Sequence, residues 1–265
     1  MLSHLLTFAI FLVIGLEIRE GVKSAASAAL PAISALGGMV LPALFYLLLS
    51  SDKSAWATAM PTDVALAIGA LSLLGKRVNP AVRLFLLTLA IADDAFSLAV
   101  IAIFFHNDLD LQSAFYTLGA AAIGALLPSR ALVLKYLAPV VSFAIVPAYI
   151  WINVFADIQI SQFASRTSIA LAVARVAGKA IGITATAYIF TRWTRLQFPQ
   201  NLELNEVFGI GLLAGMGMSV SLVIADITVS DSQVITQIHS GLLIAAALSA
   251  ALGLAWLKRF PADVR

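Results

Sequence analysis

The sequence has no cysteine and few charged residues. Without cysteine among its 265 residues, the chain can form no disulfide framework, thiolate metal site or cysteine nucleophile. Charged side chains make up 11% of the residues, against about 25% in soluble domains. The sequence also has no phosphate-binding loop, nucleophile triad or metal-ligand spacing. Together these absences exclude an ordinary cytosolic enzyme, a disordered protein and a nucleic-acid binder.

Apolar residues dominate the sequence instead: they make up 61% of the chain, and the mean hydropathy is +0.99. A membrane-spanning helix needs roughly 20 mostly apolar residues, so about nine such helices would occupy nearly all of residues 1–265. We therefore predict an all-α polytopic membrane protein with a single membrane domain, whose first segment is a retained helix and not a signal peptide. The predicted spans are Leu5–Leu16, Ala29–Leu49, Trp56–Leu74, Leu84–Phe105, Ala114–Leu127, Leu132–Phe155, Ser168–Phe190, Val207–Ile224 and Val234–Leu257.

The basic residues predict which side of the membrane is cytoplasmic. If the N-terminus lies outside and the spans alternate, the outer connections hold only Lys53 and Arg166. An excess of Lys and Arg marks the cytoplasmic side, so we predict an external N-terminus and a cytoplasmic C-terminus. The inner connections hold Arg19, Lys23, Lys76, Arg77, Arg83, Arg130, Lys135, Arg192, Arg195, Lys258, Arg259 and Arg265.

Five ionisable residues lie near the centres of predicted spans: Asp63, Asp93, Asp94, Arg175 and Lys179. Each costs at least roughly 2.5–3.5 kcal/mol on insertion scales. One interpretation is a set of buried ion pairs that hold helices together. However, one lysine and one arginine cannot neutralise three carboxylates, and a buried charge without a partner is costly. We therefore favour a functional role for these groups at mid-membrane.

Two predicted spans carry signals of interruption. Pro61 lies inside the span 56–74, and proline removes a hydrogen-bond donor and kinks a helix. The span 207–224 holds four glycines between positions 209 and 217, which favours an unwound stretch; the alternative is a glycine face for helix packing.

Each interrupted span is the middle one of three, in the segments 29–105 and 166–259, and these two sets run in opposite directions through the membrane. We read them as a first core repeat and a second, inverted one, with residues 1–28 and 106–165 as scaffold and interface helices. Inverted repeats whose broken helices meet at mid-membrane indicate an ion site in a secondary transporter.

The residue types at these positions suit a small hard cation such as Na⁺ or Li⁺, which binds oxygen ligands. Asp93 and Asp94 project about 100° apart on a helix, so one can face an ion path while the other faces a neighbouring helix. Two adjacent carboxylates do not both stay ionised cheaply at low dielectric. We expect one of them to hold a proton until a cation arrives, and this competition suffices for antiport if access alternates.

The sequence resembles the NhaA-type Na⁺/H⁺ antiporters over nearly its whole length. The resemblance lies in Thr62-Asp63-Val64-Ala65-Leu66-Ala67-Ile68-Gly69, Leu89-Ala90-Ile91-Ala92-Asp93-Asp94, Gly178-Lys179-Ala180-Ile181-Gly182-Ile183, Gly15-Leu16-Glu17-Ile18-Arg19-Glu20, Gly37-Gly38-Met39-Val40-Leu41-Pro42-Ala43 and Gly215-Met216-Gly217-Met218-Ser219. It implies an exchanger of the bacterial inner membrane that expels Na⁺ or Li⁺, serves pH homeostasis and admits more than one proton per ion.

The resemblance also implies a role for each matched residue. Asp94 is expected to be the main Na⁺ or Li⁺ ligand and proton carrier, with Asp93 beside it as a second ligand and Lys179 paired with Asp93. Thr62 and Asp63 are expected where the broken helices cross, with Asp63 offsetting helix-end dipoles. A further set resembles a pH-responsive cluster at the cytoplasmic entrance; the alternative is a solvated helix end. Its members are Glu17, Arg19 and Glu20.

The sequence departs from this family in several ways. Twelve helices are usual there, whereas about nine are predicted here. Compared with the family, we expect the first helix to be absent together with its β-hairpin, which serves dimerisation, so a homodimer would form without that hairpin. Two further helices are expected to be absent between Leu127 and Leu132. Arg175 replaces an apolar residue and is expected to act on Lys179 or pair with an aspartate. Two other functions stay open: a non-transporting remnant with a structural role, and a cation-coupled symporter.

Overall fold

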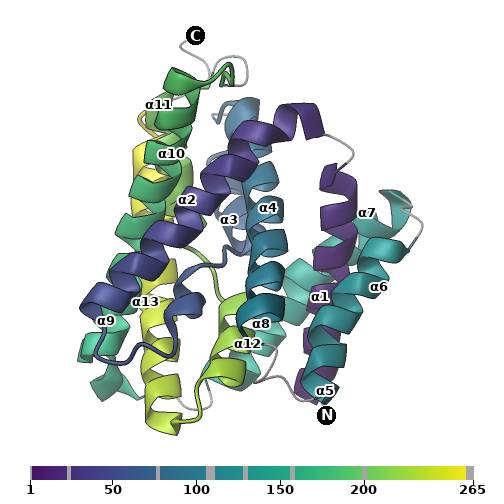
Figure 1. Ribbon diagram of the computed structural model, residues 1–265, viewed down its shortest axis with the longest axis vertical. Coiled ribbons are helices and arrows are strands. Elements are labelled where there is room, and N and C mark those ends of the chain that lie inside the picture. Colours follow the sequence, from purple (N-terminus) through teal and green to yellow (C-terminus); the bar gives the residue numbers. More distant parts are fainter. Residues whose placement is uncertain are drawn as a thin grey trace.

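A computed structural model describes residues 2–22, 25–75, 78–105, 111–127, 131–155, 159–198 and 202–260. Over these residues the chain forms helices, turns and loops and no strands (Figure 1), which confirms the predicted all-α fold. The α-helices are α1 (Leu2–Val22), α2 (Ala25–Leu49), α3 (Val64–Ser72), α4 (Pro80–Phe104), α5 (Leu111–Ala114), α6 (Ala120–Leu126), α7 (Ala131–Val140), α8 (Val146–Ile150), α9 (Arg166–Val173), α10 (Lys179–Trp193), α11 (Leu204–Ala214), α12 (Ser219–Thr228) and α13 (Ser232–Leu257).

Shorter helical turns join several of these helices. Wider π-helical turns adjoin α-helices in three segments, residues 111–126, 131–155 and 166–193. Each of these segments is therefore one continuous helix that is locally widened. The π-helical turns are Phe115–Gly119, Val141–Ile145, Trp151–Phe155 and Ala174–Gly178, and the 3₁₀ turns are Trp56–Ala59 and Ile160–Ala164.

Several helices are long and apolar enough to cross a membrane. In the described part of the chain, five pass on length and apolarity, namely residues 29–49, 80–104, 136–154, 166–193 and 232–257. Helices α11 and α12 pass together as a sixth span, bent by 51° at a short break. The chain is therefore a multi-pass membrane protein, and the count of nine spans stays a prediction.

Both predicted interruptions are present. The segment 56–72 consists of a 3₁₀ turn, a non-helical stretch over residues 60–63, and then α3. Helix α11 ends at Ala214, and the chain leaves the helix over residues 215–218 before α12 begins. Gly211 lies before the break, where a Cβ would come within 2.8 Å of the Ala180 Cα. The glycine-rich stretch therefore contains both an unwound segment and a packing contact.

Glycines bring α2 and α10 into close contact. A Cβ at Gly182 would lie 2.2 Å from the carbonyl oxygen of Gly37, and one at Gly178 would lie 2.8 Å from the Cα of Pro42. Without side chains at these positions the two backbones touch, as is common between membrane helices. This contact fixes the height of Lys179, the buried first residue of α10.

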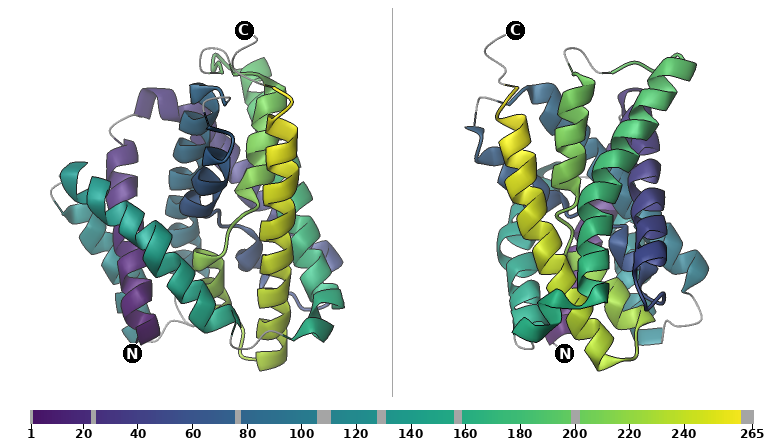
Figure 2. Two further views of the ribbon diagram at one scale, coloured as in Figure 1. Left: turned by 180° about the vertical axis from the view of Figure 1, so that it is seen from behind. Right: turned by 90° about the vertical axis from the view of Figure 1, so that its left-hand side faces the viewer.

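The helices form two groups that meet along α4 and α12. Helix α1 packs on α6, α7 and α8, whereas α10 packs on α2 and α11, and α13 packs on α9 and α11 (Figures 1 and 2). The first group belongs to the predicted scaffold segments and the second to the predicted core segments. The division into inverted repeats stays a prediction.

Helix ends gather at two opposite ends of the molecule. The start of α1 lies at one end, and the ends of α10 and α13 lie at the other (Figures 1 and 2). Part of the charge pattern behind the predicted topology falls outside the described residues: Lys23, Lys76, Arg77, Arg130 and Arg265, together with the side chain of Lys135.

Candidate ion-binding site

The two broken segments cross and bond to each other through their unwound stretches. The Thr62 hydroxyl donates to the Ala214 carbonyl at 3.0 Å, and the Asp63 N–H donates to the Met216 carbonyl at 3.3 Å. Pro61 has no N–H to offer a preceding carbonyl, which explains why the first segment cannot run on as a helix. The crossing is buried, with Thr62 1% and Asp63 6% exposed.

Asp63 binds the N-terminal ends of both second halves. Its Oδ1 accepts from the Leu66 N–H at 3.3 Å, which caps α3. Its Oδ2 accepts from the Ser219 hydroxyl at 2.8 Å and from the Ser219 N–H at 3.4 Å, at the start of α12. Helix N-termini carry partial positive charge and favour an anion. Asp63 thus lies where the resemblance implied, against two helix ends.

Lys179 joins the crossing to α4. Its Nζ donates to Asp93 Oδ2 at 2.8 Å and to the Thr62 hydroxyl at 2.7 Å, and both charged side chains are almost wholly enclosed, at 0% and 1% exposed. The expected contact between Lys179 and Asp93 is present. A buried pair of this kind is costly to break, because removing one partner leaves an isolated charge.

Asp94 faces a different space from Asp93. It is 4% exposed, and its Oδ1 is buried without accepting a hydrogen bond from any described residue. It lines a small cavity of about 40 Å³ whose polar walls are Thr62, Asp63, Ser219 and Glu17. About 10–15 Å³ suffices for one water molecule, so the space suits a small cation with little accompanying water. Adjacent residues on α4 thus serve two purposes, one in an ion pair and one at a cavity.

Glu17 and Arg19, two of the three residues matched to the pH-responsive cluster, have different surroundings. Glu17 lines the cavity beside Asp94. Arg19 donates from Nη1 to the carbonyl of Ala125, 2.7 Å away on α6. The side chain of Glu20 lies outside the described residues. Glu17 therefore belongs to the candidate site, whereas Arg19 joins α1 to α6 within the scaffold segments.

Sequence reasoning did not select Ser219, and it did not identify the hydrogen-bond partners of Arg175. Ser219 follows the unwound stretch directly and supplies both a hydroxyl and an N–H to Asp63. Arg175 donates its hydrogen bonds to carbonyl and hydroxyl oxygens of the two broken segments. The signal that could have identified Ser219 is its position directly after a glycine-rich stretch. No such signal exists for the carbonyl partners of Arg175, because every residue has a backbone carbonyl.

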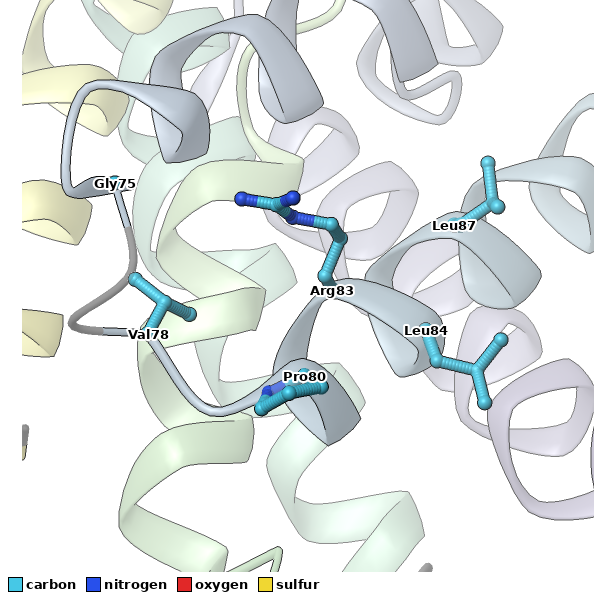
Figure 3. A pocket seen from close by; sticks show the side chains of 6 residues that line it. All are labelled: Gly75, Val78, Pro80, Arg83, Leu84 and Leu87. Atoms are coloured by element: carbon cyan, nitrogen blue, oxygen red, sulfur yellow. The ribbon is translucent and has the colours of Figure 1, made fainter. Parts of the chain in front are cut away.

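A larger hollow lies elsewhere, between the Gly75 turn and the start of α4 (Figure 3). Its volume is about 720 Å³, and the Arg83 side chain extends into it (Figure 3). None of its lining residues is a carboxylate, so it provides no anionic ligand for a cation. They are Gly75, Val78, Pro80, Arg83, Leu84 and Leu87.

The fold and the site define a class: a multi-pass helical membrane protein in which two broken helices cross beside buried carboxylates, as in ion-coupled secondary transporters. The sequence model of the family Na⁺/H⁺ antiporter 1 matches residues 2–133 and 128–257, and the chain belongs to this family. The two matched pieces meet at the place where the sequence predicts that two helices are missing.

Curated relatives are similar over most of the chain. The Na⁺/H⁺ antiporter NhaA of Glaesserella parasuis serovar 5 is 31% identical, covering 94% of this chain and 79% of the relative. The Na⁺/H⁺ antiporter NhaA of Salmonella paratyphi B is 30% identical, and the match covers 94% of this chain and 80% of the relative. Na⁺/H⁺ antiporter NhaA 2 of Aliarcobacter butzleri is 28% identical, covering 92% and 78%. The chain is therefore a membrane transporter and not an enzyme.

Proposed function

We propose that this protein exchanges cytoplasmic Na⁺ or Li⁺ for external protons at Asp94. The observation that carries the proposal is a buried carboxyl whose Oδ1 accepts no hydrogen bond in the described part of the chain and which faces a cavity at the crossing of two broken helices. A carboxyl group in such a place holds either a proton or a cation, because an isolated buried carboxylate is costly. Alternating access then couples the two fluxes.

The neighbouring residues complete the proposed site. Thr62, Asp63 and Ser219 supply oxygen atoms around the cavity, and hard cations prefer oxygen ligands. Lys179 neutralises Asp93, which leaves Asp94 as the carboxylate open to exchange. Asp93 remains a proposed second ligand, one that must leave Lys179 before it can bind a cation.

The proposed movement sets the core repeats, 29–105 and 166–259, against the scaffold segments, 1–28 and 106–165. The cavity lies between them: Glu17 comes from α1, and Asp63 and Asp94 come from the core. The proposed orientation has the N-terminus outside and the C-terminus in the cytoplasm. The start of α1 and the end of α13 lie at opposite ends of the molecule (Figure 2), as an odd number of spans requires, and the excess of Lys and Arg favours the cytoplasmic side for the C-terminus.

The cavity argues against the symporter alternative. An organic substrate needs a pocket of roughly 300–1,000 Å³, whereas the space beside Asp94 measures about 40 Å³. The remnant alternative explains the pair between Lys179 and Asp93. The remnant alternative does not explain why Asp94 is buried beside a cavity while Lys179 pairs with Asp93.

Proteoliposomes with an acidic interior test the proposal. Na⁺ added outside is expected to collapse part of the pH gradient within seconds, since each ion that enters drives protons out. Choline added at equal ionic strength, and liposomes without protein, should give no response. If Na⁺ and Li⁺ both leave the gradient of protein-containing liposomes unchanged at every pH between 6 and 9, the protein is not an exchanger.

A further inference from the structure

Arg175 is a second buried cation next to the site, and in the described part of the chain its hydrogen bonds go to carbonyl and hydroxyl oxygens and not to a carboxylate. It is 0% exposed and lies one turn before Lys179, in the π-helical turn Ala174–Gly178. Such turns occur frequently at functional sites. The guanidinium donates from Nε to the Gly215 carbonyl at 3.2 Å and from Nη2 to the Pro61 carbonyl at 2.6 Å. Nη1 donates to the Thr58 carbonyl at 2.5 Å and to the Ser221 hydroxyl at 2.8 Å.

These acceptors come from both broken segments. Thr58 lies in the 3₁₀ turn that forms the first half of one segment, Pro61 lies in the non-helical stretch after it, and Gly215 follows the last residue of α11. Carbonyls at helix C-termini lack intrahelical donors and carry partial negative charge. The guanidinium therefore binds carbonyls at and just after the ends of the two first halves. Asp63 binds the positive ends of the two second halves, so Arg175 and Asp63 bind the crossing at complementary places.

The backbone leaves room for the guanidinium at one position. A Cβ on Gly217 would lie 1.9 Å from Arg175 Nη2 and 2.2 Å from the Pro61 carbonyl oxygen. Any side chain at Gly217 would therefore collide with both the guanidinium and the chain it binds. The glycine of the unwound stretch and the arginine of the π-helical turn fit each other.

The two buried cations have separate partners. Lys179 bonds to Asp93 and Thr62, whereas Arg175 bonds to the carbonyls of the breaks. The break carbonyls of Thr58, Pro61 and Gly215 thus already accept hydrogen bonds from the guanidinium. A transported ion must then find its oxygen ligands elsewhere, and Thr62, Asp63 and Ser219 offer them at the Asp94 cavity.

We propose that Arg175 is a positioning residue that fixes the two breaks in one register and so sets Thr62, Asp63 and Ser219 around the ion bound at Asp94. This inference rests on the proposed exchange at that cavity. The planar fork of an arginine can bind several acceptors at once, and the point charge of a lysine cannot hold the same set. Charge alone is therefore not sufficient at this position.

Two variants separate the fork from the charge: Arg175→Lys keeps the charge, and Arg175→Gln loses it. We expect the half-saturating Na⁺ concentration for exchange to rise about tenfold or more in both, the size of effect that removal of an outer partner has at a metal site. The matched control is Arg166→Lys on α9, which is exposed and loses one bond to the Leu49 carbonyl; its half-saturating concentration should stay at the wild-type value.

A second readout does not depend on transport. Because the chain has no cysteine, spin labels can be placed by Ser72→Cys on α3 and Ser230→Cys just after α12, both at exposed positions. We expect a narrow distribution of label distances in the otherwise unchanged protein and a broader one with Arg175→Lys or Arg175→Gln.

The two readouts separate the inference from the proposed function. A variant that stays folded, keeps the wild-type distance distribution and keeps the wild-type half-saturating Na⁺ concentration overturns the positioning role. If the protein exchanges no ions at all, the proposed function fails, and the distance distributions alone decide whether Arg175 fixes the breaks: broadening supports it, and no change overturns it.

Discussion

Replacing Asp94 with asparagine is expected to abolish Na⁺-dependent proton movement in proteoliposomes. Asparagine has nearly the same shape but neither a negative charge nor an exchangeable carboxyl proton. The variant can therefore hold neither the exchangeable proton nor the Na⁺ ion at position 94. We expect Na⁺ binding to weaken at least about 100-fold, the upper range seen when only an outer partner of a metal site is removed. The measurement is the Na⁺-induced collapse of a preformed pH gradient.

The control for this variant is Asp52→Asn. Asp52 lies in an exposed loop, where its carboxylate accepts from the Ser54 N–H and hydroxyl. Exchange by this variant should equal that of the wild type. Exchange by a folded Asp94→Asn protein at more than a tenth of the wild-type rate would show that the proton and the cation do not compete at this carboxyl group.

Replacing Lys179 with methionine is expected to destabilise the fold by about 3–5 kcal/mol, the usual cost of removing one partner from a buried ion pair. Methionine fills a similar volume but leaves Asp93 with an isolated charge and removes a donor to Thr62. The free energy of unfolding can be measured by titrating SDS into the detergent-solubilised protein.

The double variant Asp93→Asn/Lys179→Met should recover most of this loss. Removing both charges also removes the need to keep either of them buried, so the two single effects are strongly non-additive. If the double variant is instead as unstable as the sum of the two single variants, the pair observed between Lys179 and Asp93 does not govern stability. The coupling free energy from this double-mutant cycle also measures how much the ion pair between Asp93 and Lys179 contributes to stability, which is the role that the structural alternative assigns to it.

The sequence predicted the interrupted helices because their causes are local. Pro61 cannot donate a hydrogen bond, and Gly215 and Gly217 lower the cost of leaving the helix. Both breaks occur at these residues. The placement of Asp94 against a cavity and of Asp93 against another helix follows from their adjacency on α4. The pairing of Asp93 with Lys179 came from the family resemblance and not from spacing.

Other parts of the site depend on tertiary contacts that a sequence does not display. Helix α1 runs to Val22, well past the predicted apolar span, and this extension carries Glu17 into the cavity. Its rotation is set by packing on α6, where a Cβ at Gly15 would lie 2.1 Å from the Ala121 carbonyl oxygen. The carbonyl partners of Arg175 are backbone atoms. Every residue has them, so the residue types in the sequence do not indicate which carbonyls Arg175 will bind.

Calorimetry on the purified protein can show whether a proton and a Na⁺ ion compete for Asp94. Na⁺ is titrated into the detergent-solubilised protein in buffers that differ in ionisation enthalpy, so the dependence of the measured heat on the buffer reports the protons released per ion bound. We expect proton release on Na⁺ binding, which Asp94→Asn should eliminate. Binding of Na⁺ without release of protons at any pH, or no binding of Na⁺ or Li⁺ at any pH, would contradict it.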